Sequence, residues 1–329
     1  MSTAPALAIR DLSITLGGAR GAICAVEDVA FRIAPGATTG LVGESGAGKS
    51  LTAMSILGLL PHAEVRGSIQ VAGRELTGLD EIALGRIRGK SVGMIFQEPR
   101  QSFNPAFTVG EQIAETLRWH EGLGRRAAHA RAVDLLQQVG IERPAARADE
   151  YPHTFSGGML QRAMIAMAIA CRPALLIADE PTTALDVTVQ AQILGLLKRL
   201  QAEIGMAMLF VSHDMGIIAE LCDEVIVMYA GQIVEHGRTL DLFERPRHPY
   251  TEGLLRSVPS LAPRGTNLYS IPGGTPAGGI HARGCRFGPR CPYSMQSCER
   301  AAIALEALSG GHAARCVRAA ELALTGVGS

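Results

Sequence analysis

The segment from Gly43 to Ser50, Gly-Glu-Ser-Gly-Ala-Gly-Lys-Ser, constrains the fold more than any other part of the chain. It fits the phosphate-binding loop pattern, in which a buried strand runs into a glycine-rich loop that opens a helix. An apolar run of strand type precedes it, and we expect the helix from Lys49 to Leu60, before Pro61. Glycines let backbone N–H groups and the helix N-terminus face phosphate oxygens. This context disfavours the alternative of an ordinary glycine-rich turn.

Three further side-chain patterns suggest nucleotide chemistry. Lys49 is placed to reach the β and γ phosphates, and the Ser50 hydroxyl can ligate Mg²⁺. A buried-type strand ends in Asp179, which can hold Mg²⁺ through its water shell, and in Glu180, which can orient or deprotonate an attacking water. Since hydrophobic strands often end in an acid, a structural role for this pair stays open. Ser156 starts a helix whose N–H groups could bind an anion, although an ordinary capped helix explains that pattern alone.

The order of the remaining elements predicts an α/β protein. Strands alternating with helices favour a mainly parallel sheet that is covered on both faces. Strands are expected at residues 67–73, 91–96, 174–178, 206–211, 224–228 and 232–235, and helices at 105–140, 157–171 and 187–202. After about residue 250 the composition shifts, and residues 259–292 are rich in Pro and Gly. We therefore expect a domain boundary near residues 240–260.

Charge and hydropathy exclude some classes of protein. The chain has 31 basic and 31 acidic side chains, so bulk charge would not hold it to nucleic acid or lipid. The apolar stretch from Ala163 to Cys171 is about half as long as a bilayer span requires. The first ten residues lack the features of a signal peptide, and we expect a cytosolic protein. The 47% hydrophobic content predicts either a large core or surface buried against partners.

A set of motifs in one order resembles the ATP-binding-cassette ATPases over residues 6 to about 240. The motifs are the phosphate loop, Gln97 in Ile-Phe-Gln-Glu, the Ser-Gly-Gly helix start, the Asp-Glu strand end, Thr183-Ala-Leu-Asp186 and Ser212-His-Asp214. The resemblance implies a P-loop NTPase of ABC type, with a mainly parallel sheet core, an antiparallel β subdomain and a helical subdomain at about 98–172. It places the ATPase domain at residues 1–250.

The resemblance also implies roles for individual residues. The residues that it implies for ATP binding are Gly43, Glu44, Ser45, Gly46, Ala47, Gly48, Lys49, Ser50, Leu51 and Ile23. The signature that contacts ATP held by a second subunit consists of Ser156, Gly157, Gly158, Met159 and Gln161. The Mg²⁺ ligands are Ser50, Gln97 and Asp179, and the catalytic residues are Glu180, His213 and Gln97. Gln97 looks like the Q-loop residue that senses the membrane partner, His213 like the switch histidine, and Asp186 like the D-loop residue that closes the dimer.

Two positions depart from the family pattern. Ile23 occupies the place of an aromatic residue that stacks on adenine, and isoleucine can pack there but loses the stacking geometry. Leu160 stands in the signature where a basic residue is expected.

The C-terminal part, residues 251–329, resembles the extension of dipeptide and oligopeptide importer ATPases. The resemblance rests on His248–Pro259, Ile271–Gly274, Gly284–Pro292 and the Phe155–Met159 form of the signature. Nickel importers belong to the same group, so nickel-chelate or other small-solute cargo remains an alternative to peptides.

Four of the seven cysteines, Cys285, Cys291, Cys298 and Cys316, lie near the C-terminus. In a cytosolic chain such a group suggests a metal before a disulfide. The intervals of five, six and seventeen residues contain no tight Cys-x₂₋₄-Cys pair of the kind that binds zinc. Four thiolates are what a 4Fe–4S cluster requires, and the resemblance points to the same four residues. Free or zinc-bound cysteines remain the alternative. A structural role is expected, because the cysteines lie outside every ATP motif.

These observations predict the ATPase subunit of a bacterial importer, peripheral at the cytoplasmic face of the inner membrane. Its expected partners are a second cassette, either a copy or a paralogue, two transmembrane permease subunits and, indirectly, a substrate-binding protein. Residues 98–110 are the expected surface for a cytoplasmic helix of a permease, with a core-facing loop as the alternative. A DNA-associated cassette is disfavoured by the short interval from Leu51 to Phe155 and by the zero net charge. A non-catalytic regulatory cassette is disfavoured by the intact catalytic residues.

Overall fold

The computed structural model describes residues 4–17, 21–183, 185–258, 269–274 and 283–327. Ala184 and Pro259, which belong to two of the motifs above, lie outside these residues. The chain divides into two compact units. The helical unit consists of Met1–Leu7, Ile33–Ala37 and Gln70–Leu209, and the P-loop unit consists of Ala8–Arg32, Thr38–Ile69 and Phe210–Ser329.

The helical unit is built on buried parallel strands. β6 (Val92–Ile95) pairs in parallel with β7 (Leu175–Asp179), and every residue of both strands is buried. Such continuous apolar runs are typical of parallel strands that are covered on both faces. The start of β8 (Ala207–Ser212) lies beside β7. Because parallel strands end at the same edge of a sheet, the residues that follow β6 and β7 come together there.

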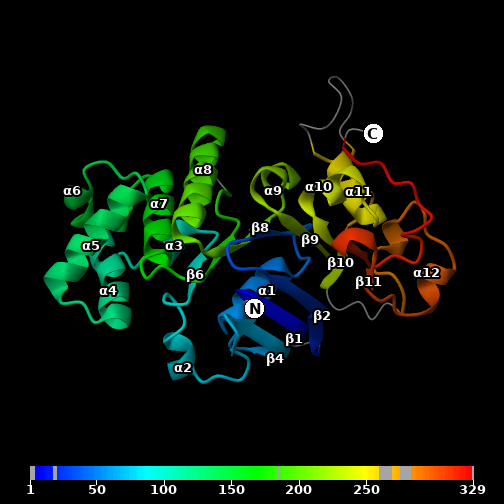
Figure 1. Cartoon of the computed structure of the whole chain (residues 1–329), viewed down its shortest axis with the longest axis horizontal. Coiled ribbons are helices and arrows are strands. Elements are labelled where there is room, and N and C mark those ends of the chain that lie inside the picture. The colour runs from blue at the N-terminus through cyan, green and yellow to red at the C-terminus, as the bar shows by residue number, and fades with distance from the viewer. Residues whose placement is uncertain (1–3, 18–20, 184, 259–268, 275–282, 328–329) are drawn as a thin grey trace. The chain divides into compact units, whose positions relative to one another are not determined.

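Helices make up most of the rest of this unit, and α4, α5, α6 and α7 form the cyan-to-green cluster in Figure 1. The elements are β5 (Arg74–Glu75), α2 (Glu81–Gly85), α3 (Pro99–Ser102), α4 (Val109–Glu121), α5 (Arg125–Gln138), α6 (Pro144–Ala148), η1 (Pro152–Thr154), α7 (Gly157–Ala168) and α8 (Val187–Ile204). The helical run predicted over residues 105–140 is two helices. Gly122 adopts a left-handed φ of 69° and ends α4, which is the usual role of glycine at a helix C-terminus.

The P-loop unit contains the strand that leads into the phosphate loop. β3 (Thr38–Val42) is buried throughout and pairs in parallel with β9 (Glu224–Tyr229). The strand order in this unit is β11-β12-β10-β9-β3, with the end of β8 beside β3, and β10 (Gln232–Arg238) runs antiparallel to β9. The helices are α1 (Lys49–Ile56), α9 (Met215–Leu221), α10 (Thr239–Glu244) and α11 (Pro249–Arg256). α1 is shorter than predicted, because Gly58 takes a left-handed φ of 63°.

A second sheet has the order β2-β1-β4-β5. Its strands are β1 (Leu7–Leu16), β2 (Ile23–Ile33) and β4 (Ala63–Val71), together with β5. β4 and β5 pair antiparallel, with Val71 opposite Arg74. The predicted fold class, an α/β cassette with mixed sheets, is confirmed.

The C-terminal part adds short elements to the P-loop unit. They are η3 (Gly288–Arg290), α12 (Ser297–Arg300), β11 (Glu306–Ala307), η4 (Ser309–Gly311) and β12 (Ala313–Ala314). β12 pairs antiparallel with β10, with Ala314 opposite Glu235. Strands of two residues are too short to show periodicity, so no sequence pattern predicts β11 or β12. The division into residues 1–250 and 251–329 remains a prediction.

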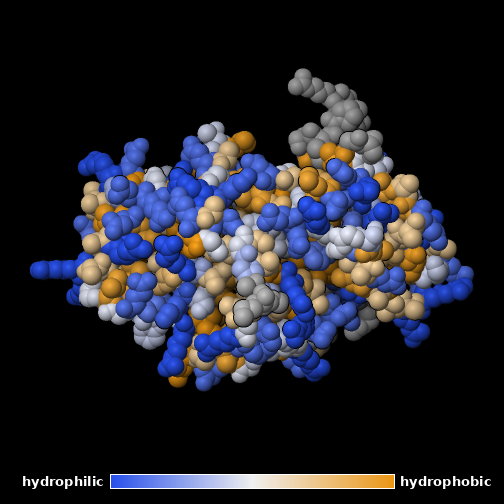
Figure 2. Space-filling view, viewed as in Figure 1, coloured by the Kyte–Doolittle hydropathy of each residue, from blue (hydrophilic) through white to orange (hydrophobic). Residues whose placement is uncertain are grey.

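In the part of the chain that the structure describes, no helix combines the length and the apolar character that crossing a bilayer requires. Figure 2 shows hydrophilic side chains over much of the face that it draws, with hydrophobic side chains scattered among them.

Candidate functional site

The phosphate loop lies between β3 and α1, as predicted, and its glycines are required by its backbone. Gly43, Gly46 and Gly48 have φ angles of 153°, 81° and 99°, a region that other residues rarely adopt. A Cβ atom at Gly43 would overlap the carbonyl oxygen of Met228. Gly48 also caps α1 without any side-chain hydrogen bond. The loop therefore presents the N-terminus of α1, with its partial positive charge, as an anion site.

Lys49 is buried, with 5% of its surface exposed, and its ammonium group turns back over the loop. Its Nζ donates to the carbonyl oxygens of Gly43 and Glu44, at 2.9 and 3.0 Å. Ser50 and Leu51 follow on the first turn of α1, both half-buried. The ammonium is thus held at the loop by two neutral carbonyls, where a phosphate would offer it a charged partner.

Glu44 connects the loop to the C-terminal part of the chain. Its carboxylate accepts two hydrogen bonds from Arg290, from Nη1 to Oε2 at 2.7 Å and from Nη2 to Oε1 at 3.0 Å. Its N–H donates to the hydroxyl of Tyr250 at 2.8 Å. The Glu44 carboxylate raises the pKa of Arg290, and burial raises the pKa of Tyr250. Neither partner is predicted by a sequence pattern, although Arg290 lies within the Gly284–Pro292 motif.

Three buried aromatic rings, one of them that of Tyr250, pack against one another next to the contacts of Glu44. Tyr229, at the end of β9, lies 4.7 Å from Tyr250 and 5.2 Å from Phe287, measured between ring centroids. Tyr250 and Phe287 are 5.3 Å apart. Fully buried aromatic side chains of this size contribute much of the burial energy of a small core. Within the P-loop unit, they attach the Cys285–Cys291 segment to β9 and α11.

In the helical unit, two residues that follow parallel strands meet as the topology requires. The Nε2 of Gln97, after β6, donates to Oε2 of Glu180, after β7, at 3.1 Å. The Thr183 hydroxyl donates to the same carboxylate oxygen at 2.9 Å. Asp179 is buried at the end of β7, with 6% exposure. Glu180 has a φ of 46°, and such backbone strain in a non-glycine residue is concentrated at functional sites.

The signature segment begins α7. The Ser156 hydroxyl accepts from the Met159 N–H at 3.3 Å and caps the helix. A Cβ atom at Gly158 would meet the Val189 side chain at 3.0 Å, so a larger residue there would require Val189 to shift. Gln161 is buried with 2% exposure, and its Nε2 lacks a hydrogen-bond partner among the described residues. Gly157 and Gly158 are half-buried, so the start of the helix stays accessible.

The other predicted positions occupy strand and helix ends. Asp186 caps α8, with Oδ1 accepting from the Val189 N–H at 2.9 Å. His213 is exposed, between β8 and α9. Ile23 starts β2 and is 38% exposed. In residues 98–110, Phe103 is buried and Phe107 is 52% exposed. The segment therefore contributes side chains both to the core and to the surface.

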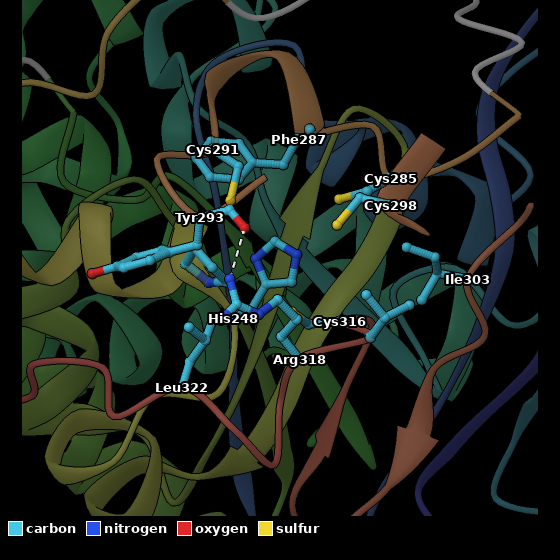
Figure 3. A pocket seen from close by; sticks show the side chains of 13 residues that line it. His248, Cys285, Phe287, Cys291, Tyr293, Cys298, Ile303, Cys316, Arg318 and Leu322 are labelled. Atoms are coloured by element: carbon cyan, nitrogen blue, oxygen red, sulfur yellow. Dashed lines mark hydrogen bonds between the residues drawn. The ribbon is translucent and has the colours of Figure 1, made fainter. Parts of the chain in front are cut away.

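All four C-terminal cysteines line one cavity, together with His248 and Phe287 (Figure 3). Cys285 and Cys291 share one segment, Cys298 lies on α12 and Cys316 follows β12. The Cys285 N–H donates to the Cys298 carbonyl at 2.7 Å. Burial raises the pKa of Cys291 to about 11, and its three neighbouring cysteines add to the shift. Among the described residues, no group of three or more His, Cys, Asp or Glu side chains is arranged to hold a metal ion.

Two family models match the chain. One, described as ABC transporter, matches residues 26–183, and the other, described as the oligopeptide/dipeptide transporter C-terminal region, matches residues 234–298. A Brucella melitensis protein named as a candidate peptide import ATP-binding protein is 49% identical over 98% of this chain and all of its own length. A Brucella abortus protein with the same kind of name is 48% identical over 96% of both chains.

Solved structures give the same fold. An ATP-binding cassette in a dimeric post-hydrolysis state, bound to ADP and Pi, has a TM-score of 0.64 and 28% identity over 71% of this chain and 98% of its own. A Clostridium perfringens subunit of an ABC transporter complex has a TM-score of 0.61 and 26% identity over 73% of this chain and 90% of its own.

Proposed function

The chain belongs to the ABC transporter family, and from that membership we propose that it is the ATP-hydrolysing subunit of a bacterial peptide importer. The observation that carries the cargo class is the similarity over nearly the whole chain to peptide import ATP-binding proteins, which includes the C-terminal region. The phosphate loop and its strand-to-helix context supply the nucleotide chemistry.

We propose that the loop residues bind the phosphates of ATP and that Lys49 neutralises their charge. Ser50, Gln97 and Asp179 are oxygen donors of the kind that Mg²⁺ prefers, and the ion would stabilise negative charge on the phosphates. Glu180 acts as the general base toward water, since its carboxylate is a hydrogen-bond acceptor that Gln97 and Thr183 orient.

The signature would act on ATP held by a second cassette. α7 begins with Ser156 and two accessible glycines, so its N-terminus can receive an anion from outside the chain. The dimeric cassette with ADP and Pi among the similar structures supports this arrangement for the fold. We infer that two cassettes enclose two ATP molecules, with His213 and Asp186 near the closing surface.

The membrane partner would bind beside Gln97. A cavity there is lined by Gln97, Glu98, Pro99, Arg100, Gly157, Thr183 and Leu185. The cavity is lined both by Gln97, the Q-loop residue, and by Gly157 at the start of α7. A permease helix in this cavity would therefore contact both. We therefore propose that the subunit works at the cytoplasmic face of the membrane, with two permease subunits and a substrate-binding protein as the rest of the importer.

We further propose that the four cysteines hold a 4Fe–4S cluster. Their convergence on one cavity supports this, because four thiolates are what such a cluster requires. Buried thiols with raised pKa values need a positive centre to become thiolates.

Peptide uptake tests the importer assignment. Cells of the source organism that lack this chain should lose uptake of radiolabelled dipeptides and oligopeptides. Wild-type protein should restore uptake, whereas a Glu180→Gln variant expressed at the same level should not. Normal peptide uptake in the deletion strain, together with loss of nickel uptake, would instead support the metal-chelate alternative.

A further inference from the structure

The segment from Cys285 to Cys291 carries two arginines whose partners lie outside the cysteine cavity. Arg290 pairs with Glu44 of the phosphate loop. Arg286 pairs with Glu27 on β2 and donates to the carbonyl oxygen of Ala230, which follows β9. Both contacts lie within the P-loop unit. The Cys285–Cys291 segment is therefore fixed both to the phosphate loop and to β2.

The Arg290 side chain is itself fixed, so it can hold Glu44 in one place. It is only 7% exposed, its Nε donates to the carbonyl oxygen of Pro272 at 2.8 Å, and its guanidinium lies over the ring of Tyr229. A bidentate pair of this kind has a defined geometry as well as charge. The backbone of Glu44 is fixed at the same time by its N–H bond to Tyr250.

Glu44 places a carboxylate in an anion-binding loop, where its negative charge repels phosphate. Its carbonyl also accepts from the Lys49 ammonium, so a shift of Glu44 would move the lysine's partner. Arg290 offsets the negative charge and keeps the carboxylate turned toward the C-terminal part of the chain.

We propose that Arg290 is a positioning residue of the nucleotide site, which neutralises Glu44 and fixes the phosphate loop for binding. This inference rests on the proposed binding of nucleotide by the loop. Arg290 would act through Glu44, to which it donates two hydrogen bonds. It gives the C-terminal part a role in nucleotide binding, in addition to the structural role that the sequence suggests.

The test is calorimetric titration of the full chain with MgADP, which is not hydrolysed and needs no second cassette. Arg290→Gln should weaken binding about tenfold, in the range of a lost charge-assisted pair. Arg290→Lys should lie between this variant and wild type, because lysine keeps the charge and loses the fork. The double variant Glu44→Gln, Arg290→Gln should regain most of the lost affinity, since the repelling charge is gone.

Arg300→Gln is the matched control, because Arg300 is an exposed arginine of the same region that bonds only to Gln296 among the contacts described. It should bind MgADP like wild type. Thermal unfolding should show that all variants are folded. Equal affinity of Arg290→Gln and wild type, or a double variant as weak as the single one, would overturn the proposal. A wild-type chain that binds no MgADP would overturn the nucleotide assignment itself, and this inference with it.

Discussion

At the scale of single residues, Glu180 combines the features that a general base requires. It follows a buried strand, has a strained backbone and accepts two side-chain hydrogen bonds. Glu180→Gln keeps the shape and removes the base, so ATP hydrolysis with the partner cassette should fall by about 10²–10⁴. ATP binding should persist, and size-exclusion chromatography with ATP should show a trapped dimer. Lys49→Ala should instead weaken nucleotide binding. Near-normal turnover of the Glu180→Gln protein would show that another group activates water.

Ile23 tests the adenine site. If it occupies the stacking position, Ile23→Tyr should tighten ATP binding by about 0.5–1.5 kcal/mol, the increment of an aromatic pair. The same change at Ile82, which is 72% exposed on α2, is the control and should leave affinity unaltered. An unchanged dissociation constant for Ile23→Tyr would mean that another side chain covers adenine.

The residues of the motifs could be predicted from sequence because each motif is local. The strand, the loop and the helix around Lys49 are contiguous, and Gln97 and Glu180 are brought together by simple parallel pairing. The partners of Glu44 could not be predicted in this way. Tyr250 and Arg290 lie 206 and 246 residues away in sequence, and only the packing of the aromatic rings brings them to the loop.

At the scale of elements, most strands and helices follow from hydrophobic runs and caps, and the ends are less predictable. Ser156 and Asp186 cap α7 and α8 as their residue types suggest. The break between α4 and α5 falls at Gly122, which ends α4, and Gly124, which precedes α5, and isolated glycines inside a polar helical pattern are a weak signal.

The packing of α7 on β6 provides a stability test. A Cβ at Gly93 would overlap the carbonyl oxygen of Ala168, at the end of α7, although the φ of Gly93 is ordinary. Gly93→Ala should therefore lower the free energy of unfolding by about 1–3 kcal/mol, the cost of overpacking. Gly195→Ala is the matched control, because nothing lies within 4 Å of that position in α8. It should raise stability by about 0.5–1 kcal/mol. Both free energies of unfolding are measured by urea denaturation. Equal effects of Gly93→Ala and Gly195→Ala would contradict the close approach of α7 to β6.

At the scale of the whole molecule, the order of motifs predicts the family, and the C-terminal sequence predicts the importer subgroup. What the order cannot predict is how the C-terminal part attaches. β12 extends the sheet through β10, Arg286 joins the Cys285–Cys291 segment to β2, and Arg290 joins it to the phosphate loop. These contacts are long-range, and no local pattern encodes them.

The cysteine cavity gives the last prediction. The region beyond residue 283 has short elements and few large apolar side chains, so a cluster would supply the cross-links that a small core lacks. Anaerobically purified protein should be brown and contain about four irons and four sulfides per chain. Cys291→Ser should remove the colour and make residues 260–329 sensitive to limited proteolysis, because the remaining thiols cannot hold the cluster.

Cys171→Ser is the control, since Cys171 lies in the helical unit and outside the cavity. It should leave iron, sulfide and protease resistance as in wild type. Colourless wild-type protein with one zinc and no sulfide would reject the cluster. Loss of colour in Cys291→Ser without new cleavage in residues 260–329 would reject its structural role, because the aromatic packing of Phe287 and the pairing of β12 with β10 would then suffice to hold the C-terminal part in place.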